Sequence, residues 1–167
     1  GDKRAGITAL LTCPLVVVLP ASGAEGQQVL QFGHEKGIKV VPRGSGTSLS
    51  GGALPLEDGI LLVTSRLCNV LEVDAANRVA RVQPGVPNNK ISDAVQHLGL
   101  GSIPDSSSHL ISTICDNVAE TAGGVFSIQH GVHAHYILAL VPVQAAGEDV
   151  HLGRAYRGAE EGTLDPM

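Results

Sequence analysis

The hydrophobic positions in the first third of the chain predict a strand, a helix and a second strand. Residues 15–19 form a continuously apolar, β-branched run, which indicates a buried strand. Ser22 and Glu25 have the spacing of a capping box, so a helix is expected to follow and to end at Gly37. Residues 39–42 predict a second buried strand. Elements in this order form a small parallel βαβ unit.

The predicted helix has an apolar side that would face the sheet. Val29, Leu30 and Phe32 are expected to point inward. Gly26 and Gly33 lie inside the same helix, where each costs roughly 1 kcal/mol relative to alanine.

The apolar pattern changes after Gly59 and indicates antiparallel strands. Residues 60–64 are apolar, residues 70–73 alternate in part between apolar and polar positions, and residues 78–82 alternate cleanly. Residues 75–77 between the two alternating runs are typical of a hairpin connection.

The last part of the pattern completes the expected fold. Residues 89–98 have the apolar spacing of an amphipathic helix, and residues 136–144 and 148–152 predict a final strand pair. The fold class is therefore expected to be α+β with two small α/β lobes. The first, residues 1–56, is a parallel βαβ lobe, and the second, residues 57–167, is a mostly antiparallel sheet with helices.

Composition narrows the range of partners. The 167 residues carry a formal net charge of −5 and no basic run, which argues against a nucleic-acid partner. No apolar run is long enough to cross a membrane. Cys13, Cys68 and Cys115 are an odd number of cysteines at irregular spacing, which favours a reducing, cytoplasmic compartment over a disulfide framework.

The most informative segment is a glycine-rich stretch after the second predicted strand. Residues 42–52 read PRGSGTSLSGG, with four glycines and four hydroxyl side chains in eleven residues. Glycines let consecutive backbone N–H groups converge on one anion, and a diphosphate suits such a loop. The stretch lacks the ending of a P-loop, and a strand rather than a helix is expected after it. The alternative interpretation is a flexible surface loop.

Two other clusters contain residue types found in metal sites and in nucleophilic catalysis. His130, His133 and His135 have a spacing that can serve Zn²⁺ or iron, but no nearby cysteine or carboxylate completes a ligand set, so a polar loop is the better interpretation. Asp105 precedes three serines, yet the chain has no G-x-S-x-G elbow, so a nucleophilic serine is not expected.

Several segments in fixed order carry a family resemblance. They are residues 42–52, 59–74, 82–86, 104–108 and 113–124, with Gly131. Together they resemble the PCMH-type FAD-binding domain of the vanillyl-alcohol oxidase superfamily, and most closely its glycolate oxidase and D-lactate dehydrogenase branch. The resemblance covers nearly the whole chain.

The resemblance implies that FAD lies between the two lobes. The residues expected at its pyrophosphate are Pro42, Arg43, Gly44, Ser45, Gly46, Thr47 and Ser48, with Gly51 and Gly52 in the same loop. Those expected near the ribityl chain and flavin are Pro104, Asp105, Asn117, Gly123 and Gly124. The Arg43 side chain has an equal alternative role, which is to brace the two lobes.

The implied activity is oxidation of a small 2-hydroxy acid of the D-lactate or glycolate type by hydride transfer to flavin. A C-terminal substrate domain, expected to be absent from this chain, supplies most groups that bind and deprotonate the acid in this family. No catalytic acid or base is therefore assigned within residues 1–167. A partner subunit, such as an iron–sulfur protein, is implied by analogy alone.

The chain departs from the family pattern in the segment 113–124. Cys115 and Asp116 stand where the pattern has two glycines, and Thr121 replaces an asparagine. At about 6 Å and an effective dielectric near 20, each charge pair between Asp116 and a diphosphate costs roughly 2–3 kcal/mol. Residues 158–164 echo a family segment that arrives early, as in a truncated copy. The alternative function is thus a non-catalytic, degenerate or truncated remnant with weak or no FAD binding.

Overall fold

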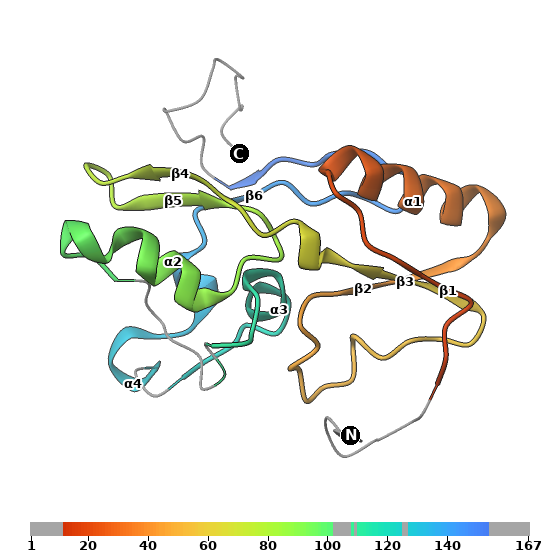
Figure 1. Cartoon of the computed structure of the whole chain (residues 1–167), viewed down its shortest axis with the longest axis horizontal. Helices are drawn as coiled ribbons and strands as arrows, with labels where there is room; N and C mark the ends of the chain where they lie inside the picture. Colours follow the sequence, from red (N-terminus) through yellow and green to blue (C-terminus); the bar gives the residue numbers. More distant parts are fainter. Residues whose placement is uncertain (1–11, 102–107, 109, 125–126, 154–167) are drawn as a thin grey trace.

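The structure is a computed structural model that describes residues 12–101, 108, 110–124 and 127–153. The described chain forms two halves that lie side by side along the longest axis of the molecule (Figure 1). One half is a three-stranded parallel sheet with a long helix. The other holds antiparallel strand pairs and short helices.

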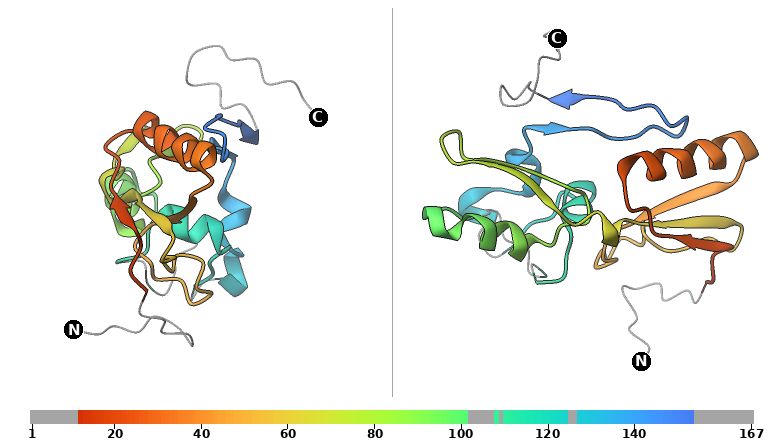
Figure 2. Two further views of the ribbon diagram at one scale, coloured as in Figure 1. Left: turned by 90° about the vertical axis from the view of Figure 1, so that its right-hand side faces the viewer. Right: turned by 45° about the horizontal axis from the view of Figure 1, so that its top comes forward.

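The parallel sheet confirms the predicted βαβ unit and adds a strand to it. Its strands are β1 (Val16–Val18), β2 (Lys39–Arg43) and β3 (Gly59–Val63), in the order β1-β3-β2. Helix α1 (Gly23–Lys36) connects β1 to β2 and lies on one face of the sheet (Figure 2).

The position of β3 corrects the expectation that the chain after Gly59 is antiparallel from the start. β3 pairs in parallel with both β1 and β2, so residues 59–63 belong to the same sheet as the strands before the loop. Its first four residues are buried and its apolar run is continuous, which is typical of a central parallel strand covered on both faces.

The ends of α1 form as the sequence predicts. The Ser22 hydroxyl accepts a hydrogen bond from the Glu25 N–H at 3.2 Å, and the Glu25 carboxylate accepts one from the Ala21 N–H at 2.7 Å. Gly37 ends the helix in the left-handed region, with a φ of 65°. The Glu25 carboxylate thus caps one residue earlier than in a standard capping box.

Three burial expectations in this half are wrong. The predicted buried strand at residues 39–42 has exposed Lys39 and Pro42, and only Val41 is buried, because β2 is also an edge strand. The predicted strand at residues 15–19 is not buried, because β1 is an edge strand whose Val16 and Val17 are 46% and 48% exposed. Phe32 is also 48% exposed. The helix approaches the sheet at Gly33 instead, where an added Cβ would lie 2.5 Å from the Val40 Cγ2 atom.

The second half begins with a short 3-10 turn that was not predicted, η1 (Thr64–Arg66). It then contains the other predicted elements, which are the antiparallel pair β4 (Val70–Asp74) and β5 (Val79–Val82), helix α2 (Asn88–Val95) with η2 (Gln96–Leu98), and the antiparallel pair β6 (Ala139–Leu140) and β7 (Leu152–Gly153). Ile91 and Val95 of α2 are buried as expected, whereas Leu98 is half-exposed. The final strand pair is shorter than predicted.

Three short helices complete this half: α3 (Ile114–Ala119), α4 (Ser127–His130) and η3 (His133–Tyr136). Helix α3 lies between the two halves in Figure 1. It is anchored by the segment before α2, since the Ile114 N–H donates to the Val86 carbonyl at 2.9 Å and the Cys115 N–H donates to the Pro84 carbonyl at 3.0 Å. Val86 is fully buried. These hydrogen bonds hold the start of helix α3 in place beside the loop that follows β2.

Candidate functional site

The glycine-rich loop between β2 and β3 has the converging N–H groups that the sequence predicts. The backbone N–H groups of Gly44, Ser45 and Gly46 all donate to the side chain of Asp116 in α3. The three N···O distances are 3.1, 2.8 and 3.3 Å, respectively. Three successive amides on one carboxylate form an anion-binding nest.

Two hydroxyl groups complete the surroundings of the Asp116 carboxylate. The Ser45 Oγ donates to its Oδ2 atom at 2.8 Å, and the Thr113 Oγ1 donates to the same atom at 3.0 Å. The carboxylate is partly buried in this position. All five donors stabilise a negative charge at this place, and here that charge belongs to the Asp116 side chain of the same protein.

Glycine is needed at two places in this loop. At Gly44, an added Cβ would overlap the Thr113 hydroxyl and come within 2.5 Å of Asp116 Oδ1. Gly46 has a φ of 72°, and a Cβ there would overlap the guanidinium group of Arg43. The Arg43 side chain therefore lies against the loop.

The far end of the loop binds a second carboxylate. Glu120, the residue after α3, accepts hydrogen bonds from the Ser48 hydroxyl at 2.7 Å and from the Ser50 hydroxyl. These hydrogen bonds, that of Ser50 first, lower the pKa of the Glu120 carboxyl below its ordinary value, while desolvation and the nearby Asp116 act in the opposite direction. Two carboxylates four residues apart thus engage one loop.

Asn117 is the expected flavin-side residue with the clearest structural peculiarity. It lies in α3 and is only 3% exposed. Its side-chain Nδ2 atom has no hydrogen-bond partner within the described part of the chain. A buried amide donor without an acceptor is costly, so it indicates a place for an acceptor from a ligand or from elsewhere in the protein.

The other expected site residues do not contact the Asp116 carboxylate. Thr47 Oγ1 lies 3.5 Å from Ser45 Oγ, and Gly124 donates its N–H to the Ser127 hydroxyl. The Gly51 carbonyl accepts a hydrogen bond from the Leu54 N–H at 3.1 Å, and Pro42, Gly52 and Gly123 are exposed. Pro104 and Asp105 lie outside the described residues.

Sequence reasoning alone did not find three members of this site, Ser50, Thr113 and Glu120. Glu120 follows Asp116 by four residues, a spacing that places two side chains on one helical face. That spacing was the available signal, but nothing in it indicates that the partner would be a loop about seventy residues earlier.

The remaining candidates form structural contacts. The His133 ring Nδ1 lies 2.7 Å from the Ala122 carbonyl oxygen, and the His135 Nδ1 accepts from the Val132 N–H. Within the described residues no group of three or more His, Cys, Asp or Glu side chains is arranged to hold a metal ion. Nor is any helix there long and apolar enough to span a membrane.

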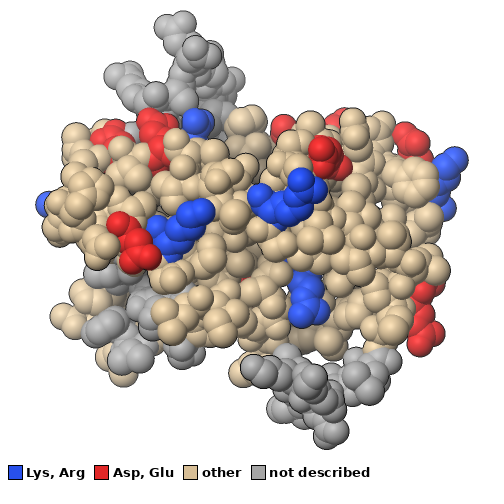
Figure 3. Space-filling model, viewed as in Figure 1, with Lys and Arg blue, Asp and Glu red and all other residues tan. Residues whose placement is uncertain are grey.

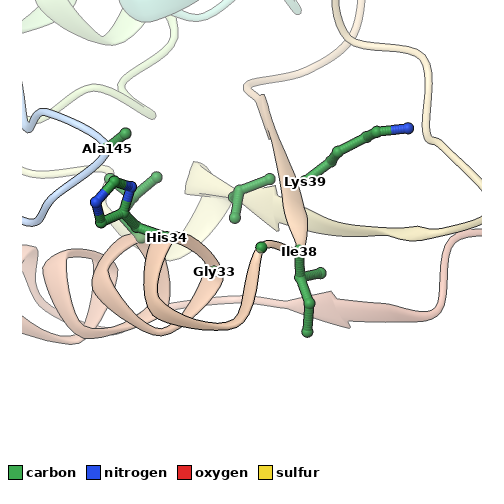
Figure 4. Close-up of a pocket in the computed structure, with 8 residues that line it drawn as sticks. Gly33, His34, Ile38, Lys39 and Ala145 are labelled. Carbon is green, nitrogen blue, oxygen red and sulfur yellow. The ribbon is translucent and has the colours of Figure 1, made fainter.

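A shallow hollow of about 340 Å³ lies away from the loop, where the end of α1 meets β2 (Figure 4). Gly33 and Ile38 lie at its wall beside His34, and the Lys39 side chain points away from it. On the face shown in Figure 3, Lys and Arg side chains lie singly rather than in a patch. The loop and α3 are therefore the candidate site.

The comparisons with known proteins bear directly on this loop. Residues 14–153 match the family described as the FAD binding domain, which includes both the loop and α3. This chain belongs to the FAD binding domain family. The family match indicates FAD as the cofactor of the domain, in agreement with the sequence-based resemblance.

The curated relatives are flavin oxidoreductases of greater length. The FAD binding domain is 45% identical over 148 residues to the glycolate oxidase subunit GlcD of Escherichia coli (strain K12), covering 89% of this chain and 30% of that protein. It is 41% identical over 138 residues to D-lactate dehydrogenase of Archaeoglobus fulgidus, covering 83% of this chain and 31% of the relative. The chain thus spans about a third of the length of these relatives.

Solved structures confirm the fold. A chitooligosaccharide oxidase aligns with a TM-score of 0.75 at 15% identity, over 85% of this chain and 30% of that one. An alkyldihydroxyacetonephosphate synthase aligns with a TM-score of 0.72 at 23% identity, over 87% of this chain and 27% of that one. These likenesses show the α+β architecture of the FAD binding domain.

The residues of the loop fit the diphosphate part of FAD. The Asp116 carboxylate is a stand-in anion, and it shows that the amides of Gly44, Ser45 and Gly46 converge on charged oxygen atoms. The absence of a Cβ at Gly44 allows an anion to approach the backbone closely. The donor set is thus that of a phosphate site whose donors are directed at a side chain of the same protein.

Proposed function

We propose that this chain is the FAD-binding part of an oxidoreductase that oxidises a 2-hydroxy acid of the glycolate or D-lactate type. The observation that carries the proposal is the 45% identity to GlcD over a segment that contains the anion-binding loop and α3. Two relatives that share this segment act, by their names, on glycolate and on D-lactate, and a third is named D-2-hydroxyglutarate dehydrogenase.

In this function the loop holds the pyrophosphate. The amides of residues 44–46 and the Ser45 and Thr47 hydroxyls would donate to it, and Arg43 beside Gly46 would add positive charge. Asn117, whose side-chain amide has no partner among the described residues, would donate to the cofactor from the second lobe. Bound FAD supplies the acceptor for the hydride from the hydroxyl-bearing carbon.

We infer that the groups that bind and deprotonate the hydroxy acid lie outside residues 1–167, in a substrate domain or a partner subunit. The chain matches only about 30% of the length of GlcD, which leaves room for such a domain in the relatives. No catalytic residue is assigned to the FAD binding domain itself.

A second function has one observation in its favour. The Asp116 carboxylate takes the hydrogen bonds that a phosphate would receive. A protein that keeps the fold but does not bind FAD would show the same arrangement, and it would serve as a non-catalytic remnant.

FAD titration of the purified chain, followed by quenching of flavin fluorescence, tests the proposed function. We expect saturable binding that weakens at least tenfold in Gly46→Val, because this substitution strains a residue at a φ of 72° and displaces Arg43. Gly26→Ala is the matched control, since no described atom lies within 4 Å of its added Cβ. A folded protein that does not bind FAD would support the remnant instead.

The substrate class needs a separate experiment. In a chimera, this chain replaces the matching 148 residues of the Escherichia coli GlcD protein. We expect anaerobic addition of glycolate or D-lactate to bleach the absorbance of the bound flavin. Bleaching by neither acid, in a chimera that retains FAD, would contradict the hydroxy-acid assignment and leave FAD binding intact.

A further inference from the structure

The two ends of the glycine loop each hold one carboxylate of the same short segment. Asp116 receives the amides of residues 44–46, and Glu120 receives the hydroxyls of Ser48 and Ser50. The segment thus offers the loop two negative charges at neighbouring places. FAD offers the same loop a diphosphate, which is also two linked negative groups.

The loop does not have enough donors for both anions at once. The N–H groups of Gly44, Ser45 and Gly46 are each directed at an Asp116 oxygen, and a backbone N–H has a single hydrogen to donate. A phosphate oxygen placed at these amides would also lie close to an anionic carboxylate, which is repulsive in a partly buried site. Either Asp116 or the diphosphate can therefore occupy the nest.

We propose that Asp116 is an internal competitor for the pyrophosphate subsite of this domain. The inference rests on the proposed function, because it takes the diphosphate of FAD as the ligand of the loop. Binding of FAD requires the Asp116 side chain to leave the amides of Gly44, Ser45 and Gly46. Asp116 thereby sets how much FAD is needed to load the protein.

Two features make this displacement practicable. The Asp116 side chain is not fully buried, so it can reach water when it leaves the loop. Its helix α3 is only six residues long and is anchored at its start, through Ile114 and Cys115. The backbone can therefore stay in place while the carboxylate turns away.

Affinity measurements on uncharged variants test the competition. We expect Asp116→Gly to bind FAD ten- to a hundredfold more tightly than the unmodified chain, in isothermal titration at low salt, where electrostatic effects are strongest. Asp116→Asn, which keeps the side-chain shape, should bind at least threefold more tightly. Asp93→Asn removes one charge from an exposed position of α2 and should change the affinity less than twofold.

Amide spectra without FAD test whether the carboxylate occupies the loop in solution. In ¹H–¹⁵N spectra, we expect the amide protons of Gly44, Ser45 and Gly46 to move upfield in Asp116→Asn, because they lose a charged acceptor. In the unmodified chain, added FAD should shift the Asp116 side-chain carboxyl resonance as that group leaves the loop. Asp93→Asn should shift neither set.

The outcomes separate the competition from the proposed function. Equal FAD affinity in the unmodified chain and Asp116→Gly would overturn the competition and leave FAD binding standing. Unmoved amide resonances in Asp116→Asn would also overturn it, since the carboxylate would then not be on the loop. Folded variants that do not bind FAD with or without Asp116 would overturn the competition and the proposed function together.

Discussion

Glu120 shows how a single side chain at the site responds to its neighbours. Its carboxyl pKa is lowered first by the hydrogen bond from Ser50 and then by that from Ser48, whereas the charge of Asp116 raises it. We expect Ser50→Ala to raise the Glu120 pKa toward its ordinary value of 4.5 and Asp116→Asn to lower it further. A ¹³C NMR titration of the Glu120 carboxyl measures both shifts.

The sign of the corresponding stability change follows from the same shift. Because the pKa of Glu120 is lower in the folded chain, its contribution to the free energy of unfolding is present above about pH 4.5 and is lost as the pH falls through the folded value. Ser65→Ala, at an exposed serine of η1, is the control and should leave the Glu120 titration unchanged. Shifts of the same sign in Ser50→Ala and Asp116→Asn would contradict the hydrogen-bond assignment.

At the scale of one element, α1 contains two glycines with opposite roles. Alanine favours a helix interior over glycine by about 1 kcal/mol, so Gly26→Ala should raise the free energy of unfolding by up to that amount. Gly33→Ala should lower it, because the new methyl would lie 2.5 Å from Val40 Cγ2 and 3.0 Å from the Ile38 carbonyl oxygen, which forces the helix away from β2. Urea unfolding of both variants measures the difference.

The comparison within one helix makes this prediction sharp. Both substitutions add the same methyl group to the same helix. Helix propensity alone would therefore raise the free energy of unfolding in both variants. Stabilisation by Gly33→Ala equal to that by Gly26→Ala would show that α1 does not approach the sheet at Gly33.

The elements themselves were largely predictable, because local signals determine them. The residues Ser22 and Gly37 at the ends of α1 act through short-range hydrogen bonds and a left-handed turn that the sequence shows directly. The errors concern position in the sheet. Nothing local distinguishes the apolar run of β1, at an edge, from that of β3, at the centre, since only the pairing order exposes one and buries the other.

At the scale of the whole molecule, the site was predictable only in part. The density of glycines in residues 42–52 indicated an anion-binding loop, and the structure confirms converging amides. The negative charge of Asp116 was expected to oppose a diphosphate, but its direct bonding to the loop was not expected. That contact joins residues about seventy positions apart, and no local pattern encodes such a pairing.

The Asp116 contact joins the two halves of the molecule, so its removal should affect stability and binding in opposite directions. In Asp116→Gly without FAD, the amides of Gly44, Ser45 and Gly46 and two hydroxyls lose their acceptor. We expect the free energy of unfolding to fall by roughly 1–3 kcal/mol, as for the loss of partly buried hydrogen bonds to a charged group. Denaturant unfolding without ligand measures this loss.

With FAD the difference in stability between Asp116→Gly and the unmodified chain should narrow. A ligand at a hundredfold excess over its dissociation constant stabilises a fold by about 2.7 kcal/mol, and the stabilisation is greater for the variant that binds more tightly. FAD should therefore raise the midpoint of unfolding more in Asp116→Gly than in the unmodified chain, while Asp93→Asn should follow the unmodified chain in both conditions. If Asp116→Gly is as stable as the unmodified chain without FAD, the carboxylate does not hold the two halves together. An increase in the unfolding midpoint on adding FAD that is no larger in Asp116→Gly than in the unmodified chain would mean that Asp116 stabilises the fold but does not compete with the cofactor.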